Sequence, residues 1–280
     1  MTMLPKLGFS LESKYDRPMQ QVIALLKQAG FSALSPVWTN LQALQEIACC
    51  AQAEGMALQS LHAPPKGIAA LWQPDSEESL PLQAQMFACL DACVQYGIPV
   101  LVVHGWQGHG YTFPDTPLDF SFFDRLVTAA HEKGIAIAFE NLEGEEYLAA
   151  LLERYKNQAH VGYCWDSGHD HCYPHQLDFL ARFGNRLLMT HLNDNLGFRG
   201  QDGKPISRDD MHILPFDGTI DWSYAIQRLK TCRPQSILNF ELKTVSHRLP
   251  TYPQWTLEQW IAEAGSRARQ LAEAYSTLSS

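Results

Sequence analysis

The feature that most constrains this chain is a short apolar run that stops at a residue able to bind a metal or move a proton. The clearest case is residues 135–140, IAIAFE, where apolar residues end in a carboxylate. The same ending recurs with VLVV before His104, VGYCW before Asp166, LLMT before His191 and ILNF before Glu241. Buried parallel strands are near-continuous apolar runs, and barrel active sites lie at their carboxyl ends. The pattern therefore predicts one shared site at the rim of a parallel sheet.

Strand and helix signals alternate along the whole chain. The strand candidates begin near residues 6, 31, 56, 99, 135, 161, 187 and 236. Helical patterns follow each of them, and a (β/α)8 barrel typically takes about 250 residues. The 280 residues therefore predict one α/β domain, a single (β/α)8 TIM barrel over 1–280, with long active-site loops at about 104–118 and 192–219. A doubly wound open sheet is the alternative, but it would not bring five strand ends into one ring.

Charge and composition narrow the class of protein. The formal net charge of −9 disfavours a general nucleic-acid-binding or membrane-surface protein. The N-terminal sequence MTMLPKLGFSLESKYD has no apolar core of a secretory signal, and no run approaches the roughly 18 apolar residues of a membrane span. The seven cysteines lack a repeated CxxC frame. We therefore expect a cytoplasmic protein that is not bound to a membrane.

The strand-end residues of the second half suit a metal. Glu140, Asp166, His191 and Glu241 end the fifth to eighth strand candidates. Three carboxylates placed close together repel one another, and a divalent cation is the simplest compensation. Mixed oxygen and nitrogen ligation suits Mn²⁺, Mg²⁺, Co²⁺ or Zn²⁺. The alternative is four unrelated polar residues in solvated positions.

Further candidates surround these four on the same face. His62 and His104 end the third and fourth strands, His169 lies three residues after Asp166, and Asp210 and His212 lie in the long loop near 192–219. We predict that these side chains contact substrate or metal. The fourth loop offers Trp106, which suits a lid over the apolar face of a sugar as well as a base stack.

A metal flanked by two carboxylates implies particular chemistry. The cation can hold a carbonyl and a neighbouring hydroxyl, which acidifies the C–H bond between them. One glutamate then removes that proton and the other returns it, which gives epimerisation or aldose–ketose isomerisation. The same metal could instead activate water for hydrolysis. The residues alone do not choose between these reactions.

The order of the motifs resembles the xylose isomerase-like TIM barrel superfamily, which includes sugar phosphate isomerases and epimerases and AP endonuclease family 2. The motifs are HAPP, VVHG, AFENLEG, WDSGH, HLNDN, DMH, GTIDW and FELK, from about residue 5 to 245. The resemblance implies a metal held by Glu140, Asp166, His191 and Glu241, with Glu140 and Glu241 as the acid/base pair. It also implies substrate contacts from His169, Arg208 and Arg248, and it leaves a homo-oligomer open.

Two readings of this resemblance compete. The favoured one is a metal-dependent isomerase or epimerase of a sugar, keto-sugar or cyclitol. However, HLND stands where many sugar-acting members have H-x-H-D. A larger set of residues also matches the three-zinc ligand set of endonuclease IV: His62, His104, Glu140, Asp166, His169, His191, Asp210, His212 and Glu241. An apurinic-site endonuclease is therefore the alternative, disfavoured because no continuous basic stripe is present. A barrel that binds a polyol without turning it over is the third reading.

Overall fold

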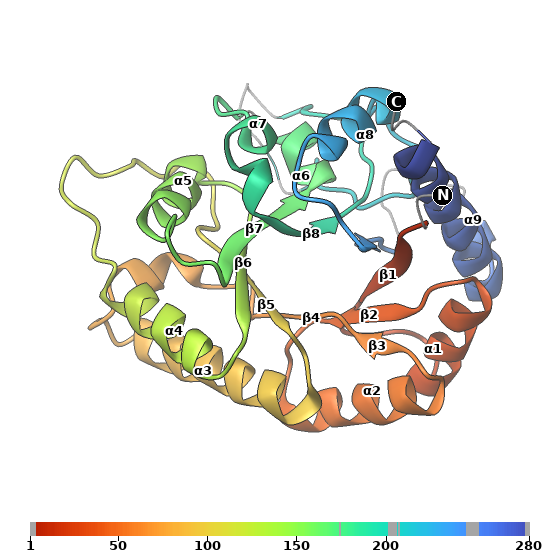
Figure 1. Ribbon diagram of the computed structural model, residues 1–280, viewed down its shortest axis with the longest axis horizontal. Coiled ribbons are helices and arrows are strands. Elements are labelled where there is room, and N and C mark those ends of the chain that lie inside the picture. The colour runs from red at the N-terminus through yellow and green to blue at the C-terminus, as the bar shows by residue number, and fades with distance from the viewer. Residues whose placement is uncertain (1–3, 174, 201–205, 207, 245–251, 278–280) are drawn as a thin grey trace.

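A computed structural model describes residues 4–173, 175–200, 206, 208–244 and 252–277. Its strands are all parallel where they pair, in two sheets of order β3-β2-β1-β9 and β4-β5-β6-β7-β8. Parallel bridges between Val37 and His62 and between Leu192 and Phe240 join the two sheets at both ends. The strands therefore form a ring, which Figure 1 shows with the helices outside it. The strands are β1 (Lys6–Leu11), β2 (Ala33–Pro36), β3 (Ala57–Leu58), β4 (Ser60–His62), β5 (Val100–His104), β6 (Ala136–Glu140), β7 (Val161–Asp166), β8 (Leu187–His191) and β9 (Ile237–Phe240).

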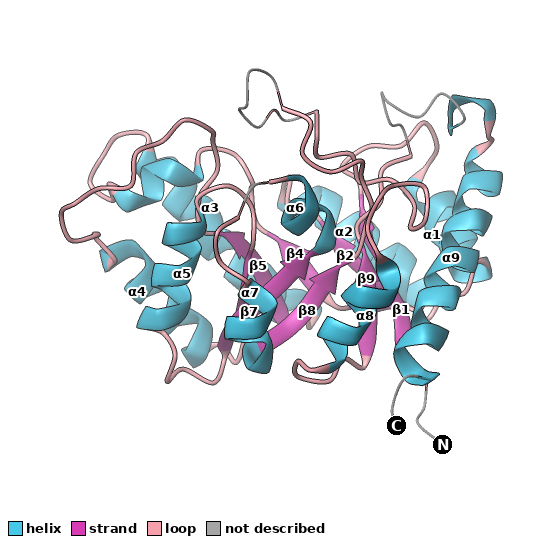
Figure 2. Ribbon diagram, turned by 90° about the horizontal axis from the view of Figure 1, so that it is seen from above, coloured by secondary structure: helices cyan, strands magenta, loops and turns pink. Residues whose placement is uncertain are grey.

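The helices follow the strands in turn and cover the outside of the ring. They are α1 (Met19–Gln28), α2 (Leu41–Ala53), α3 (Ser79–Tyr96), α4 (Ser121–Glu132), α5 (Glu145–Arg154), α6 (Ser167–Cys172), α7 (Phe179–Phe183), α8 (Trp222–Lys230) and α9 (Leu257–Thr277). Short 3₁₀ turns lie at η1 (Ile68–Trp72), η2 (Gly184–Arg186) and η3 (Tyr252–Gln254). Figure 2 shows long loops gathered above one end of the strands. Within the described chain, no helix is both long and apolar enough to cross a membrane.

The alternation of side chains along the strands explains how the site is placed. Val102, Ala138, Cys164 and Met189 form a small buried cluster of their own, separate from the main core. Their strand neighbours Leu101, Val103, Ile137 and Phe139 belong to the large core that includes the helices. Successive side chains on a strand point to opposite faces, so the cluster of four faces the interior of the ring.

The same alternation carries the functional groups inward. His104, Glu140, Asp166 and His191 each follow one member of the interior cluster by two residues, and all four are buried. In the strand register, His104 pairs with Glu140 and Asp166 with His191. The interior layer therefore continues upward as a layer of polar, ionisable side chains at the carboxyl ends of the strands.

The prediction of an α/β TIM barrel is confirmed, with two local differences. The third predicted strand is divided at Gln59 into β3 and β4. In addition, two short helices, α6 and α7, follow β7 where the alternating pattern predicts one. The helix α6 begins at once after β7 because the Asp166 carboxylate caps it, accepting the N–H of His169 at 2.7 Å. A six-residue helix shows too little periodicity to be recognised in the sequence.

Candidate metal centre

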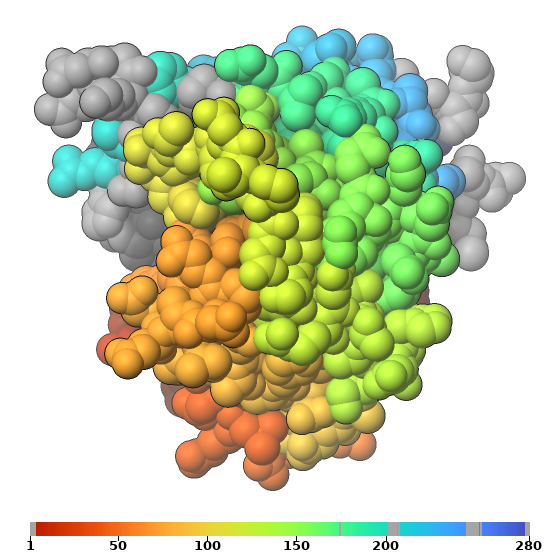
Figure 3. All heavy atoms as spheres, turned by 90° about the vertical axis from the view of Figure 1, so that its left-hand side faces the viewer, coloured from red at the N-terminus to blue at the C-terminus, as the bar shows by residue number. Residues whose placement is uncertain are grey.

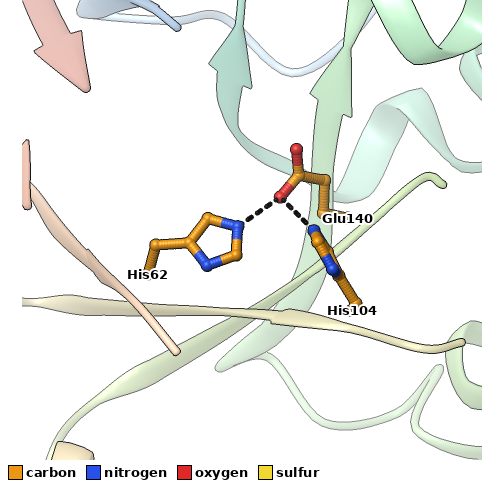
Figure 4. A group of neighbouring side chains, drawn as sticks. All are labelled: His62, His104 and Glu140. Atoms are coloured by element: carbon orange, nitrogen blue, oxygen red, sulfur yellow. Dashed lines mark hydrogen bonds and ion pairs between the residues drawn. The ribbon is translucent and has the colours of Figure 1, made fainter. Parts of the chain in front are cut away.

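The Glu140 carboxylate lies at the centre of the site and contacts three histidines. Its Oε2 lies 3.1 Å from Nε2 of His62 and 3.2 Å from Nε2 of His104. Figure 4 shows both imidazole rings pointing at this one carboxylate oxygen from separate strands. Its Oε1 lies 2.8 Å from Nδ1 of His191. The Glu140 side chain is completely buried, so its charge is compensated by these rings rather than by water.

A second group forms on the other side of Glu140. His191 Nδ1 also lies 2.8 Å from Glu241 Oε2. Ligand atoms of Glu140, Asp166, His191 and Glu241 all lie within 4.8 Å of one another. The predicted metal residues are thus gathered at one point, with three carboxylates and one imidazole.

A third group lies beside Asp166. His169, Asp210 and His212 have ligand atoms within 4.8 Å of one another, and His212 Nε2 lies 2.9 Å from Asp210 Oδ1. His212 adopts a left-handed backbone with φ of 47°, which is uncommon for a residue with a side chain and is found preferentially at functional sites. His62, His104 and Glu140 form a group of the same kind. Glu140 also forms a group with Cys164 and His191. It therefore belongs to three of the four groups found among the described residues, and the group that begins at His169 is the fourth.

The histidines are oriented as metal ligands usually are. Nδ1 of His62, His169 and His212 lies 2.7, 2.8 and 3.1 Å from the backbone carbonyl oxygens of Ala63, Asn141 and Glu241 respectively. A ring nitrogen that donates to a carbonyl fixes the tautomer and leaves Nε2 as the free electron pair. In each of these rings Nε2 faces a carboxylate of the site. These donor atoms fit a divalent cation.

The charges of the protein groups themselves show what a cation would replace. Burial by itself would raise the pKa of Glu140, but the His191 imidazolium and hydrogen bonds from three histidines hold it well below the usual range. Burial likewise opposes the charge on His191, yet neighbouring Cys164, Glu140 and Glu241 raise its pKa well above the usual range. Burial also opposes the charge on His169, but Asp166 and Asp210 raise its pKa well above the usual range. Protons on imidazoles therefore supply the positive charge that a metal would supply.

Asp166 is held in place by an outer layer of amides. Its Oδ2 accepts a hydrogen bond from Asn193 Nδ2 at 2.8 Å, and its backbone N–H donates to Asn141 Oδ1 at 2.8 Å. Burial raises the pKa of Asp166, and the positive charges of His169 and His212 oppose that effect. Asn141 and Asn193 were not predicted as part of the site, although each directly follows a strand-end motif. Such outer partners orient the ligands of metal sites.

Asp194 anchors the long loop that carries Asp210 and His212. Its carboxylate is buried and accepts hydrogen bonds from four donors between residues 195 and 222. Its backbone also pairs with Ile213 in both directions, at 2.9 and 3.0 Å. The HLND motif thus has two roles, because His191 faces the ion site whereas Asp194 shapes the loop above it.

The site is a pocket of about 260 Å³ at the carboxyl end of the strands. It is lined by Val37, His62, Pro65, His104, Gln107, Glu140, Leu142, His169, Asp210, His212, Glu241 and Lys243. Gln107 and Lys243 are not among the predicted site residues. The strand alternation that places Glu241 in the pocket also places Lys243 there, and this signal could have identified it.

The remaining predicted contacts lie elsewhere. Trp106 stacks on Tyr147 with ring centroids 4.3 Å apart, and its Nε1 donates to the Gly108 carbonyl oxygen, outside the lining of the metal pocket. Figure 3 shows this loop in yellow on the outer surface of the molecule. Arg208 is exposed. Arg248 lies outside the described residues. The roles of Trp106, Arg208 and Arg248 stay predictions.

Comparisons with known proteins agree with this geometry. The family model described as "Xylose isomerase-like TIM barrel" matches residues 23–269. The "Uncharacterized protein y4fM" of Sinorhizobium fredii (strain NBRC 101917 / NGR234) is 37% identical over 164 residues. That match covers 53% of this chain and 49% of the relative, so it spans about half the length of either protein.

Solved structures share the fold at low identity. A xylose isomerase domain protein from Planctomyces limnophilus has a TM-score of 0.70 at 15% identity, covering 97% of both chains. The 3-keto-D-glucoside 4-epimerase of E. coli has a TM-score of 0.68 at 15% identity, covering 95% of this chain and 99% of that one. D-Psicose 3-epimerase of Clostridium cellulolyticum H10 has a TM-score of 0.64 at 14% identity, with the same coverage.

Proposed function

Because the chain belongs to the xylose isomerase-like TIM barrel family, we propose that it is a divalent-metal-dependent isomerase or epimerase of a sugar, keto-sugar or cyclitol. The observation that carries this proposal is the group of Glu140, Asp166, His191 and Glu241, whose ligand atoms all lie within 4.8 Å of one another. Solved structures named as keto-sugar epimerases have the same fold, which supports the substrate class.

The four residues of this group would hold the cation. Among the buried imidazole atoms of the described chain, Nε2 of His191 has no hydrogen-bond partner. A buried polar atom without a partner is costly unless something else satisfies it. When bound, a divalent cation would hold a substrate carbonyl and an adjacent hydroxyl and so acidify the C–H bond between them.

Glu241 and Glu140 would carry the proton transfer. The Glu241 side chain is 20% exposed in the pocket, whereas that of Glu140 is completely buried. Positive neighbours, chiefly His191, lower the pKa of Glu241 despite its burial, so its carboxylate is ionised at neutral pH. Glu241 would remove the proton, and Glu140 would return one at the opposite face or at the adjacent carbon. His169, whose pKa is raised, would donate a hydrogen bond to a substrate oxygen.

The test is exchange of substrate hydrogen with solvent. The manganese-loaded protein is incubated with a panel of ketoses in deuterated water, and NMR follows loss of the C–H signal beside the carbonyl. Glu241→Gln should slow exchange by about 100-fold or more, the usual contribution of a general base. Glu146→Gln, an exposed glutamate that accepts a hydrogen bond from Tyr111, is the matched control. Metal content is measured in both variants, and unchanged exchange in a metal-loaded Glu241→Gln would refute the proposal.

One observation favours a second candidate, phosphodiester hydrolysis at a three-zinc centre. Among the described residues, the site contains not one but four ligand groups, and Glu140 is common to three of them. Such centres activate water and stabilise the leaving oxygen. Elemental analysis after zinc saturation separates the candidates. One tightly held ion per chain supports the sugar enzyme, whereas three zinc ions together with cleavage of abasic-site DNA would replace it.

A further inference from the structure

A second hollow opens beside the metal pocket, between the segment after β1 and the segment that begins α9. Its volume is about 500 Å³, against about 260 Å³ for the metal pocket. Its walls come from Glu12, Lys14, Tyr15, Asp16, Arg17, Thr244, Tyr252, Trp255, Thr256, Leu257 and Trp260. Small-molecule sites usually measure roughly 300–1,000 Å³, so the metal pocket alone is small and the two hollows together are typical. A substrate that fills both would extend well beyond the sugar carbon at the metal.

Two consecutive residues line the two hollows. Lys243 lines the metal pocket, and the next residue, Thr244, lines the second hollow. Glu12 Oε1 accepts hydrogen bonds from both the backbone N–H and the hydroxyl of Thr244, at 3.0 and 2.8 Å. These bonds fasten the segment after β1 to the end of β9. The second hollow is therefore held in a fixed position beside the site that would carry the chemistry.

The lining of the second hollow combines aromatic rings with polar groups. Tyr252 and Trp255 are stacked with ring centroids 5.5 Å apart, and Trp255, which lines the hollow, is only partly buried. Trp260 is 2% exposed, and its Nε1 has no hydrogen-bond acceptor within the described chain. Native proteins seldom bury an N–H without a partner. Exposed Lys14 and Asp16 lie at the edge of the same hollow.

From this lining we infer that the second hollow binds a second sugar ring, joined by a glycosidic bond to the sugar in the metal pocket. A pyranose has an apolar face of C–H groups, which packs on an aromatic ring such as that of Trp255. It also has a rim of hydroxyls, which accept from Lys14 and donate to Asp16. The inference rests on the proposed sugar chemistry and narrows its substrate class to disaccharide-sized glycosides.

The test is equilibrium binding, which needs no turnover. Calorimetry measures a panel of disaccharides with α and β linkages, each against its two constituent monosaccharides, with metal-loaded protein. We expect at least one disaccharide to bind about ten-fold or more tightly than either constituent, which corresponds to about 1.4 kcal/mol. Trp255→Ala should remove this gain. Tyr224→Ala on α8, where Tyr224 is 58% exposed, is the matched control and should not change it.

Three outcomes would overturn the inference. No disaccharide binds more tightly than its constituents, the increase in affinity survives Trp255→Ala, or a phenyl glycoside shows as large an increase in affinity as the disaccharide. The last result would mean that the hollow accepts any flat ring. Circular dichroism and melting temperature verify that each variant is folded. Failure of the proposed function is a separate result, because it would appear as absent solvent exchange with every sugar, whether or not binding depends on Trp255.

Discussion

Replacing Asp194 by asparagine should loosen the loop that carries Asp210 and His212. Oδ1 of Asp194 accepts the N–H groups of Asn195 and Ile220, at 2.9 and 3.2 Å. Its Oδ2 accepts the N–H of Phe216 and Nε1 of Trp222, at 3.0 and 2.9 Å. An asparagine offers one oxygen and one NH₂ group, so in either orientation two of these donors meet another donor instead of an acceptor.

The expected magnitude follows from these four bonds. A buried donor left without an acceptor costs about 1–3 kcal/mol, so two of them cost about 2–6 kcal/mol. A domain has a total stability of only about 5–15 kcal/mol, and the change is therefore measurable as a large shift of the denaturant midpoint. Because Ile213 is bonded to the backbone of Asp194, residues 210 and 212 should move with the loop, and zinc retention should fall as well.

Asp221→Asn is the matched control. Asp221 caps α8, where one carboxylate oxygen accepts the N–H of Tyr224 at 3.0 Å. Asparagine caps helices as well as aspartate, so we expect a change within about 0.5 kcal/mol. Urea unfolding of the ion-free proteins measures both variants. If Asp194→Asn and Asp221→Asn unfold at the same midpoint, the reasoning on Asp194 is wrong.

Two further predictions concern the ion site. Since the pKa values of His191 and His169 are raised, binding an ion must displace their protons, so metal affinity should increase as pH rises. Calorimetry in buffers of different ionisation enthalpy should detect this proton release, and a buffer-independent heat would contradict it. Gly168→Ala places a Cβ 1.8 Å from Asn193 Oδ1, so Asn193 must shift and release Asp166. We expect weaker metal binding by about ten-fold or more, the usual effect of losing an outer partner of a ligand; unchanged affinity in a folded variant would count against this role of Asn193.

The barrel and the ring of strand-end residues were predictable from the sequence because both follow from local rules. An apolar run identifies a buried strand, and period-two alternation determines which residues share a face. His104, Glu140, Asp166 and His191 each end such a run, and parallel strands in a ring bring their carboxyl ends together. The motif order then predicted the family.

Only the tertiary structure decided how these side chains are divided and oriented. That Glu140 serves three ligand groups depends on rings from β4, β5 and β8 meeting one carboxylate, and no spacing in the sequence determines such distances. The choice of Nε2 or Nδ1 depends on backbone carbonyls of other strands and loops. The second hollow joins residues 12–17 to residues 252–260, more than 230 positions apart. Contacts of this kind depend on how the closed ring brings distant segments together, which local patterns do not encode.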